Sequence, residues 1–469
     1  METGHLSIHS ENIFPIIKKW LYSDHDIFVR ELISNASDAI TKLKKLVLMG
    51  EAHVEDDEIY RIDVTLDPEA KTLTFSDNGI GMTAEEIKQY INQIAFSGAE
   101  DFVAKYKGST DGDQIIGHFG LGFYSAFMVA SRVEIQSLSH RAGEASVHWV
   151  NEGGTEFRMS PGSRVNRGTD VILHLAEDGA DFASAWKLRE TIEKYCSFMP
   201  YPIYLHDLSA KASGAADMEA KQSDAESRDE GSRNDESAEL ADAEVVETPL
   251  NTTHPLYLSN ASEVTVEQYK EFYRSTFRDY RDPLFQIHLN MDYPFNLKGI
   301  LYFPKLGNDL ELMDGQIKLY NSQVFVADNI KEVIPEFLML LKGVIDCPDL
   351  PLNVSRSFLQ NDGFVRKISG YISKKVSDKL LSLFRQERST YEGFWEDIHP
   401  FIKFGAIRDD KFREAIQEAI LFRTDRGEYR TLNELKIRQG EQDSTENPSA
   451  STGKTTIYYA NDPKKQAQY

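Results

Sequence analysis

The chain has 469 residues, of which 41% are hydrophobic and 11% aromatic, and its formal net charge is −23. This length is too great for one hydrophobic core and predicts roughly two to four domains. The negative charge excludes a general binder of nucleic acid or anionic membranes, because such partners need a cationic surface.

The cysteines and the first residues of the chain indicate the cellular compartment of the protein. Cys196 and Cys347 lie far apart without a zinc-ligand pattern, which is typical of a reducing compartment. The first residues lack a basic region followed by an apolar run, and no window approaches 18 consecutive apolar residues. We therefore expect a cytoplasmic protein without a secretory signal or a membrane span.

Residues 1–208 are expected to form one α+β domain. The stretch "RELISNASDAI" is amphipathic at helical spacing, and "YRIDVTLD" and "TLTFSD" alternate as the strands of a β-hairpin. A helix is predicted from Thr83 to about Ala104, followed by strands in "RVEIQSLS", "SVHWV" and "TDVILHL". Because strands and helices do not strictly alternate, a sandwich with helices on one face of a sheet is expected.

Residues 209–248 are predicted to be an acidic, flexible linker. The segment has 12 acidic and 4 basic residues, a net charge of −8, and no aromatic residue. Such a composition cannot offset the entropy lost on ordering, although a surface helix around "AELADAEVVE" is the alternative.

Beyond the linker, residues 249–388 and 389–469 are assigned to two further units. Strands are predicted in "PLFQIHLN", "LKGILYFPK" and "IKLYNSQVFV", and helices in "NIKEVIPEFLMLLKGVI" and "FVRKISGYISKKVSDKLLSLF". The stretch "YEGFWEDIHPFIKFGA" opens the second, helix-rich unit.

Three polar residues border the apolar stripe of the first predicted helix. Glu31, Asn35 and Asp38 are spaced by four and seven residues, which brings them to nearly the same side of a helix. They are either a salt-bridged shoulder of the core or one wall of a site.

The run "SDNGIGMT" places Asp77 at the end of a strand, before Gly79 and Gly81. Glycines there allow a flat ligand to approach the backbone, and the carboxylate can accept a hydrogen bond from an exocyclic amine such as that of adenine. Taken alone, an Asx turn that closes the strand is the preferred interpretation.

The run "GHFGLGFYSAFMVA" has Gly117, Gly120 and Gly122 before an apolar stretch that should start a helix. Free backbone N–H groups at a helix start suit phosphate oxygens, and a glycine hinge is an equally good interpretation. The run "CPDLPLNVSRSFLQND" sets Arg356 in a short connector, where it either grips a carboxylate or reaches a terminal phosphate across a domain junction. Taken alone, the structural interpretation is preferred.

In this order, the runs together resemble the heat-shock protein 90 chaperone family of the bacterial high-temperature protein G type. The resemblance covers nearly the whole chain and includes "FVRELISNASDAITKL", "DNGIGMT", "GHFGLGFYSAF", "RGTDVILHL", "EFYRSTFRDYRDPL", "DLPLNVSR" and "DPKKQAQY". It implies a Bergerat-type α/β sandwich at 1–208, then an α/β/α middle domain with a smaller helix-rich α/β subdomain. It also implies an ATP-dependent molecular chaperone that hydrolyses ATP to ADP with Mg²⁺.

The resemblance assigns roles to the same residues. Glu31 would be the general base for the attacking water, Asn35 would hold Mg²⁺, and Arg356 would contact the γ-phosphate. Asp77 would bind the adenine amine with Thr169 and a water in support. The remaining residues expected to bind the nucleotide are Asp38, Gly81, Met82, Gly117, Gly120, Gly122 and Phe123.

Two departures from the family pattern are visible. Phe96 stands where the family commonly has a lysine, and Tyr90 replaces a small polar residue, with Asn92 as an uncertain substitute. The family also continues into a C-terminal dimerisation domain, which we expect to be absent here. The full-length protein would then be a homodimer, and this chain a monomer or weak dimer with slow ATP hydrolysis.

The resemblance implies partly folded client proteins as partners, and neither nucleic acid nor membrane. Candidate contacts with clients are Tyr293, Phe295, Trp395 and Phe401, for which a core role is the preferred interpretation. The alternatives are another ATPase on the same nucleotide fold, namely a histidine kinase or a DNA-acting enzyme, and a nucleotide-gated binding module that does not hydrolyse ATP.

Overall fold

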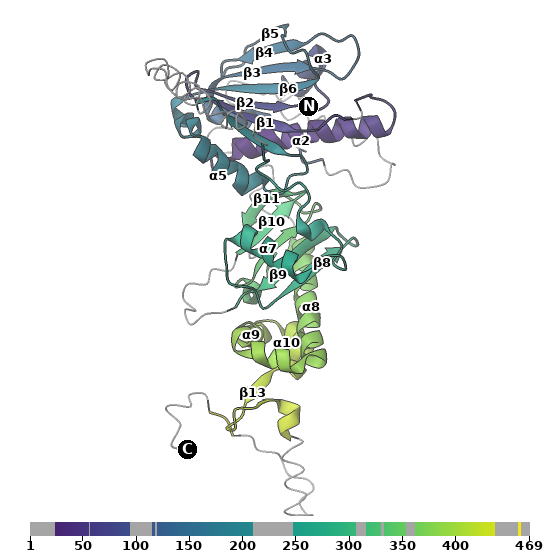
Figure 1. Ribbon diagram of the computed structural model, residues 1–469, viewed down its shortest axis with the longest axis vertical. Coiled ribbons are helices and arrows are strands. Elements are labelled where there is room, and N and C mark those ends of the chain that lie inside the picture. The colour runs from purple at the N-terminus through teal and green to yellow at the C-terminus, as the bar shows by residue number, and fades with distance from the viewer. Residues whose placement is uncertain are drawn as a thin grey trace, which may run out of the picture.

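The computed structural model describes residues 24–55, 57–93, 115–117, 120–209, 247–305, 316–329, 333–352, 362–436 and 458–460. These residues form an elongated column, with a large sheet and its helices at one end, a second sheet in the middle and a helical unit beyond it (Figure 1). The α+β fold class is confirmed.

The first sheet has seven strands in the order β5-β4-β3-β6-β2-β1-β7. Its strands alternate buried and partly exposed residues, as in Ile62, Val64 and Leu66 of β1, so one face is buried against helices. The strands are β1 (Ile62–Asp67), β2 (Thr72–Asp77), β3 (Ala130–Leu138), β4 (Val147–Asn151), β5 (Phe157–Pro161), β6 (Gly168–Leu175) and β7 (Ile203–Asp207). The predicted β1–β2 hairpin is confirmed.

Helix α2 (Ile27–Leu48) packs against β1, β2 and β6, and α5 (Ala185–Cys196) packs against α2 and β7. Helix α3 (Ala84–Tyr90) starts at a capping box between Thr83 and Glu86. The predicted continuous helix to Ala104 is wrong, because the chain turns at 91–93, and residues 94–104 lie outside the described part. The helix expected after Gly122 is the 3₁₀-helix η3 (Gly122–Met128), and η4 (Glu177–Ala183) precedes α5.

The second sheet has five strands in the order β11-β10-β12-β9-β8. Their bounds are β8 (Phe285–Met291), β9 (Leu297–Phe303), β10 (Gln316–Asn321), β11 (Val324–Asp328) and β12 (Lys342–Asp346). Helix α7 (Val266–Phe277) and η5 (Leu256–Leu258) precede them. The predicted helix over 329–345 is wrong: Pro335 interrupts it, only η7 (Glu336–Leu338) forms, and the apolar end becomes β12.

The long helix α8 (Asp362–Gln386) is confirmed and leads to α9 (Arg388–Arg408), α10 (Asp410–Ile416) and η8 (Gln417–Ala419). A small hairpin of β13 (Leu421–Arg423) and β14 (Tyr429–Thr431) follows. One apolar core joins the second sheet to α8, α9 and α10. The unit boundary at 388/389 remains a prediction.

Residues 210–246 of the acidic linker lie outside the described part, but both of its flanks are described. At the end of the linker, Glu247 forms an ion pair with Arg61 at 3.3 Å, and beyond it the Leu250 N–H donates to the Ile203 carbonyl at 2.8 Å. The Asn251 side chain also bonds the backbone at Ile203. The chain therefore leaves β7 and returns to the same edge of the first sheet.

Candidate functional site

Helix α2 carries the three polar residues that the sequence singles out. Glu31 and Asp38 are buried, whereas Asn35 is exposed. The Asp38 carboxylate accepts backbone N–H bonds from Ile116 at 2.8 Å and from Gly117 at 2.7 Å. Asp38 therefore fastens the segment 115–117 to the helix and places it beside Asn35.

Glu31 is paired with its neighbour in sequence. The Arg30 guanidinium donates from Nε and Nη2 to Oε1 of Glu31 at 3.0 and 2.8 Å, and both side chains are buried. The other oxygen, Oε2, faces the glycine-rich run, since a Cβ on Gly122 would lie 2.5 Å from it. Only glycine allows this close approach of the chain to the carboxylate.

Asp77 ends β2 and is buried. Its Oδ1 accepts the Gly79 N–H at 2.8 Å, so the Asx turn of the simpler interpretation is present. Burial raises the pKa of the Asp77 carboxyl to about 7, while the Gly79 N–H and the nearby Arg164 favour its charged form. A buried acid of this kind is a candidate binding group as well as a turn former.

The turn after Asp77 packs directly on α2. The Ile80 N–H donates to the Ala39 carbonyl at 3.1 Å, and a Cβ on Gly79 would lie 2.5 Å from the Ala39 carbonyl carbon. Ala39 is eight residues from Glu31, a rise of about 12 Å along a helix. The turn that follows Asp77 therefore meets α2 about 12 Å along the helix axis from Glu31, so both acids border the same helix.

Residues of the neighbouring strands β3 and β6 surround Asp77. In the sheet register Thr169 of β6 lies opposite both Asp77 and Ser137. The Ser137 hydroxyl is 2.9 Å from the Thr169 hydroxyl and accepts the Met82 N–H at 2.8 Å. Thr169 and Met82 are thus linked to each other through Ser137.

Gly81 is the most constrained glycine of this turn. Its φ is +63°, and a Cβ would lie 1.9 Å from the Leu138 carbonyl oxygen. We expect Gly81→Ala to destabilise the protein by more than about 2 kcal/mol, measured by denaturant unfolding. Gly143→Ala is the matched control, with φ +85° in open space, and should cost about 1 kcal/mol. Equal losses in both variants would contradict the close packing at Gly81.

The glycine-rich run meets α2 at two points. A Cβ on Gly117 would lie 3.1 Å from Asp38 Oδ2 and 3.7 Å from Asn35 Oδ1. Gly120 has a φ of +63°. The run therefore lies along the same helix that carries Glu31 and Asn35, with glycine where the two approach.

The side chain of Phe123 lies in the core, and the expected contact of this residue with phosphate remains a prediction. Its buried ring packs edge-on against Tyr124, Phe127 and Trp149, at 5.5, 6.3 and 5.8 Å between ring centroids. The ring is thus part of the core beneath the glycine-rich run, and only the Phe123 backbone remains for a phosphate contact.

Two residues named in the sequence analysis lie outside the described part: Arg356, expected at the γ-phosphate, and Phe96, a departure from the family pattern. The described flank of the Arg356 run is anchored by Asn321, whose Nδ2 donates to the carbonyls of Cys347 at 3.1 Å and Pro348 at 2.9 Å. The other two residues that depart from the family pattern are described. Tyr90 is the last residue of α3, and the Asn92 side chain accepts a hydrogen bond from the Trp149 indole N–H at 2.9 Å.

Sequence reasoning missed three contributors to the site. Ser137 is found only once the β3–β6 pairing is known. Arg164 donates to the Asp77 carbonyl at 2.7 Å from a loop 87 residues away. Lys42 lies one turn after Asp38, and its burial lowers its pKa while Asp38 and Glu86 raise it. The spacing of four from Asp38 was the one signal for Lys42 in the sequence.

The expected client contacts divide into two groups. Phe295, Trp395 and Phe401 are buried in the core of the second sheet and its helices, whereas Tyr293 is 89% exposed. In the described part, no helix has the length and apolarity needed to cross a membrane. No group of three His, Cys, Asp or Glu residues is arranged to hold a metal among those same residues.

Two protein families match this chain, one within the first domain and one from the end of that domain onward. Residues 22–156 match the family described as histidine kinase-, DNA gyrase B- and HSP90-like ATPase, and residues 181–445 match the Hsp90 protein family. The chain is 43% identical over 467 residues to the chaperone protein HtpG of Porphyromonas gingivalis W83, covering 99% of this chain and 63% of that protein.

Two further chaperone proteins of the same name are similar to this chain along nearly its whole length. The chain is 44% identical over 476 residues to the chaperone protein htpG of Bacteroides fragilis YCH46, with 100% of this chain and 64% of that protein covered. It is 32% identical over 475 residues to HtpG of Desulfitobacterium hafniense Y51, covering 99% and 69%. The chain thus spans less than two thirds of the length of the first of these relatives. With one family match over more than half of its residues and relatives of this similarity along its whole length, the chain belongs to the Hsp90 family.

Proposed function

We propose that the first 208 residues bind ATP and hydrolyse it, and that this reaction drives an ATP-dependent molecular chaperone. The observation that carries the proposal is the convergence of three separated stretches on α2: the helix itself, the turn after Asp77, and the glycine-rich run at 117–122. The match of residues 22–156 to an ATPase family supports it.

At one end of this part of α2, Asp77 would accept a hydrogen bond from the adenine amine, with Thr169 in support. Gly81 and Met82 would line the base, since a glycine turn lets a flat ring approach the backbone. The backbone N–H groups of the run that includes Gly117, Gly120 and Gly122 would receive the phosphates. Asp38 would act through the segment 115–117 that it holds rather than by touching nucleotide.

At the other end, Glu31 would orient a water and accept its proton as the oxygen attacks the γ-phosphate. Arg30 binds Oε1, and Oε2 lies on the side of the glycine-rich run, where the attacking water would bind. Arg356 from the second unit would stabilise charge on the γ-phosphate, which makes hydrolysis depend on how residues 249–388 meet the first domain.

Asn35 would hold Mg²⁺ through its amide oxygen. The site fits this ion: Asn35 is exposed beside Gly117, where glycine leaves the space open, and phosphate oxygens and waters supply the other ligands that Mg²⁺ prefers. The chemistry that the ion would contribute is neutralisation of charge on the triphosphate.

The chaperone part of the proposal is that partly folded proteins bind the middle units, in the cytoplasm. The names of the curated relatives support it, and the two cysteines, Cys196 and Cys347, are both free thiols. Homodimerisation of a longer protein and slow hydrolysis by this chain remain predictions.

Calorimetric titration with ATP and ADP, with and without Mg²⁺, tests the nucleotide site. We expect saturable binding of both nucleotides with one site per chain, because Glu31, Asn35 and the turn after Asp77 meet along one helix of the described residues. Mg²⁺ should increase the affinity for ATP more than the affinity for ADP, since ATP offers more phosphate oxygens to the ion. Absence of heat with either nucleotide would remove the basis of the proposal.

A further inference from the structure

Strand β8 is an edge of the second sheet, where it pairs with β9 and no other strand of the described residues. Its sequence, "FQIHLNM", has no charged residue and no proline, which are the usual protections of an exposed edge. Every second residue of such a strand directs its backbone N–H and C=O away from the sheet. The edge is therefore chemically ready to pair with another chain.

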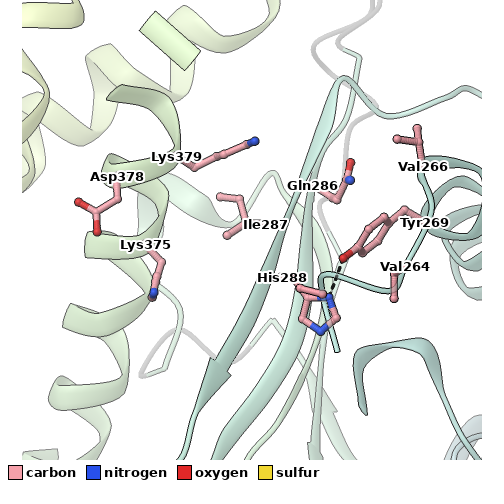
Figure 2. A pocket seen from close by; sticks show the side chains of 10 residues that line it. Val264, Val266, Tyr269, Gln286, Ile287, His288, Lys375, Asp378 and Lys379 are labelled. Carbon is pink, nitrogen blue, oxygen red and sulfur yellow. Dashed lines mark hydrogen bonds between the residues drawn. The ribbon is translucent and has the colours of Figure 1, made fainter. Parts of the chain in front are cut away.

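A groove of about 500 Å³ runs beside this edge (Figure 2). Its floor is Gln286, Ile287 and His288 of β8. Helix α8 forms one wall, and the segment 261–266 with Tyr269 of α7 forms the other. The groove thus lies between the two helical layers that cover the faces of the sheet.

The two walls differ in chemistry. Lys375 and Lys379 are one turn apart on α8, and Lys379 extends toward β8, whereas Asp378 shares the rim and leaves one net positive charge. The opposite wall is apolar, with Val264 and a Val266 that is 54% exposed. A ligand with acidic groups on one side and apolar groups on the other fits both walls.

His288 takes no part in recognising a ligand, because both of its ring nitrogens are engaged. Nε2 lies 3.3 Å from the Tyr257 carbonyl and donates to it, and Nδ1 accepts from the Tyr269 hydroxyl at 2.7 Å. Further along the strand, the Tyr371 hydroxyl donates to the Asn290 carbonyl and closes that end of the edge. The open part of β8 is therefore Phe285 to Leu289.

We propose that this groove binds an extended segment of a partner protein, which adds to β8 as a sixth strand. The partner segment alternates acidic and apolar side chains, so that its acids meet Lys375 and Lys379 while its apolar side chains meet Val264 and Val266. Charge complementarity with the lysine pair selects this chemistry. The groove shares no residue with the proposed nucleotide site, so binding of this segment should not require ATP.

A fluorescein-labelled peptide of ten residues that alternates Glu and Val tests the proposal by fluorescence anisotropy with the full chain. The double variant Lys375→Glu/Lys379→Glu should bind about tenfold more weakly, because two attractive pairs become repulsive. Lys374→Glu is the matched control: Lys374 is exposed on the same helix outside the groove, and its variant should change affinity by less than about twofold.

A second variant tests the apolar wall. Val266→Glu places an acid at the first position of α7, where the helix dipole favours it, and should weaken the peptide without harming the fold. Val165→Glu, at an 84% exposed site of the first domain, is its control. Circular dichroism confirms that each variant is folded.

Hydrogen exchange identifies the mode of binding. The bound peptide should slow exchange of amides between Phe285 and Leu289, and a peptide with proline at alternate positions should not bind. Equal affinity of the double variant and the parent, or unchanged exchange in β8, would overturn the proposal. Binding seen only after residues 210–246 are replaced by a Gly/Ser loop would overturn it too, because the chain's own acidic segment would then be the occupant.

Discussion

Asp77→Asn is expected to weaken ATP binding by about 100-fold, measured by calorimetry at pH 8. A carboxylate accepts a charge-assisted hydrogen bond from the adenine amine, whereas the asparagine amide loses the charge and can turn a donor toward the same amine. Retained affinity would mean that the base binds elsewhere.

The same substitution should stabilise the protein in the absence of nucleotide. The pKa of Asp77 is raised from 3.8 to about 7 by burial, so the folded protein binds this proton more tightly than the unfolded chain. The stability that Asp77 contributes is therefore lost as the pH rises from about 4 to 7. Three pKa units correspond to about 4 kcal/mol, so the gain from Asn should approach that value at pH 8 and fall below about 1 kcal/mol at pH 4.

Denaturant unfolding at the two pH values measures this effect. Asp67→Asn is the matched control, because Asp67 is a carboxylate on the same hairpin that caps the exposed N–H groups of Glu69 and Ala70. Its variant should leave ATP affinity unchanged and shift stability little. A loss of stability in Asp77→Asn at pH 8 would show that the Asx turn, rather than the buried charge, dominates this position.

Glu31→Gln should lower the turnover number for ATP by about 10²–10⁴-fold and leave the dissociation constant of ATP within about threefold. Glutamine keeps an acceptor for the Arg30 guanidinium, so the helix stays intact, but it cannot take a proton from water. Phosphate release under saturating ATP measures the turnover, and calorimetry measures the binding.

The control is Glu69→Gln, an exposed position in the β1–β2 turn, which should leave both quantities unchanged. Unchanged turnover in Glu31→Gln would refute the general-base role. If the parent itself binds ATP without turnover, the chain is a nucleotide-gated binding module and not an ATPase.

Local patterns predicted much of the first domain. The alternation of Ile62, Val64 and Leu66 sufficed for β1, and the spacing of Glu31, Asn35 and Asp38 sufficed to place them on one side of α2. These predictions succeeded because periodicity and the strand-ending Asp77 reflect local chemistry.

Features that depend on distant partners were not predictable. The stretch 329–345 has the apolar content of a helix, yet Val344 and Ile345 pair with β9 and β10, so the sheet overrides helical propensity. The partners of Asp38 and Thr169 come from segments 78 and 32 residues away, and nothing in the spacing indicates them. The resemblance to a family supplies only the expected roles of Asp38 and Thr169. Their contacts become visible only in the folded structure.

The return of the chain to the edge of β7 after residue 246 has a consequence for insertions into the acidic stretch. Arg61 and Ile203 hold Glu247 and Leu250 at the edge of the first sheet, so β7 lies beside both described ends of the acidic stretch. Doubling its length would add only about 0.6 kcal/mol of closure entropy. Insertions of a reporter or an affinity sequence between 210 and 246 should therefore leave the stability of the first domain nearly unchanged, as measured by denaturant unfolding.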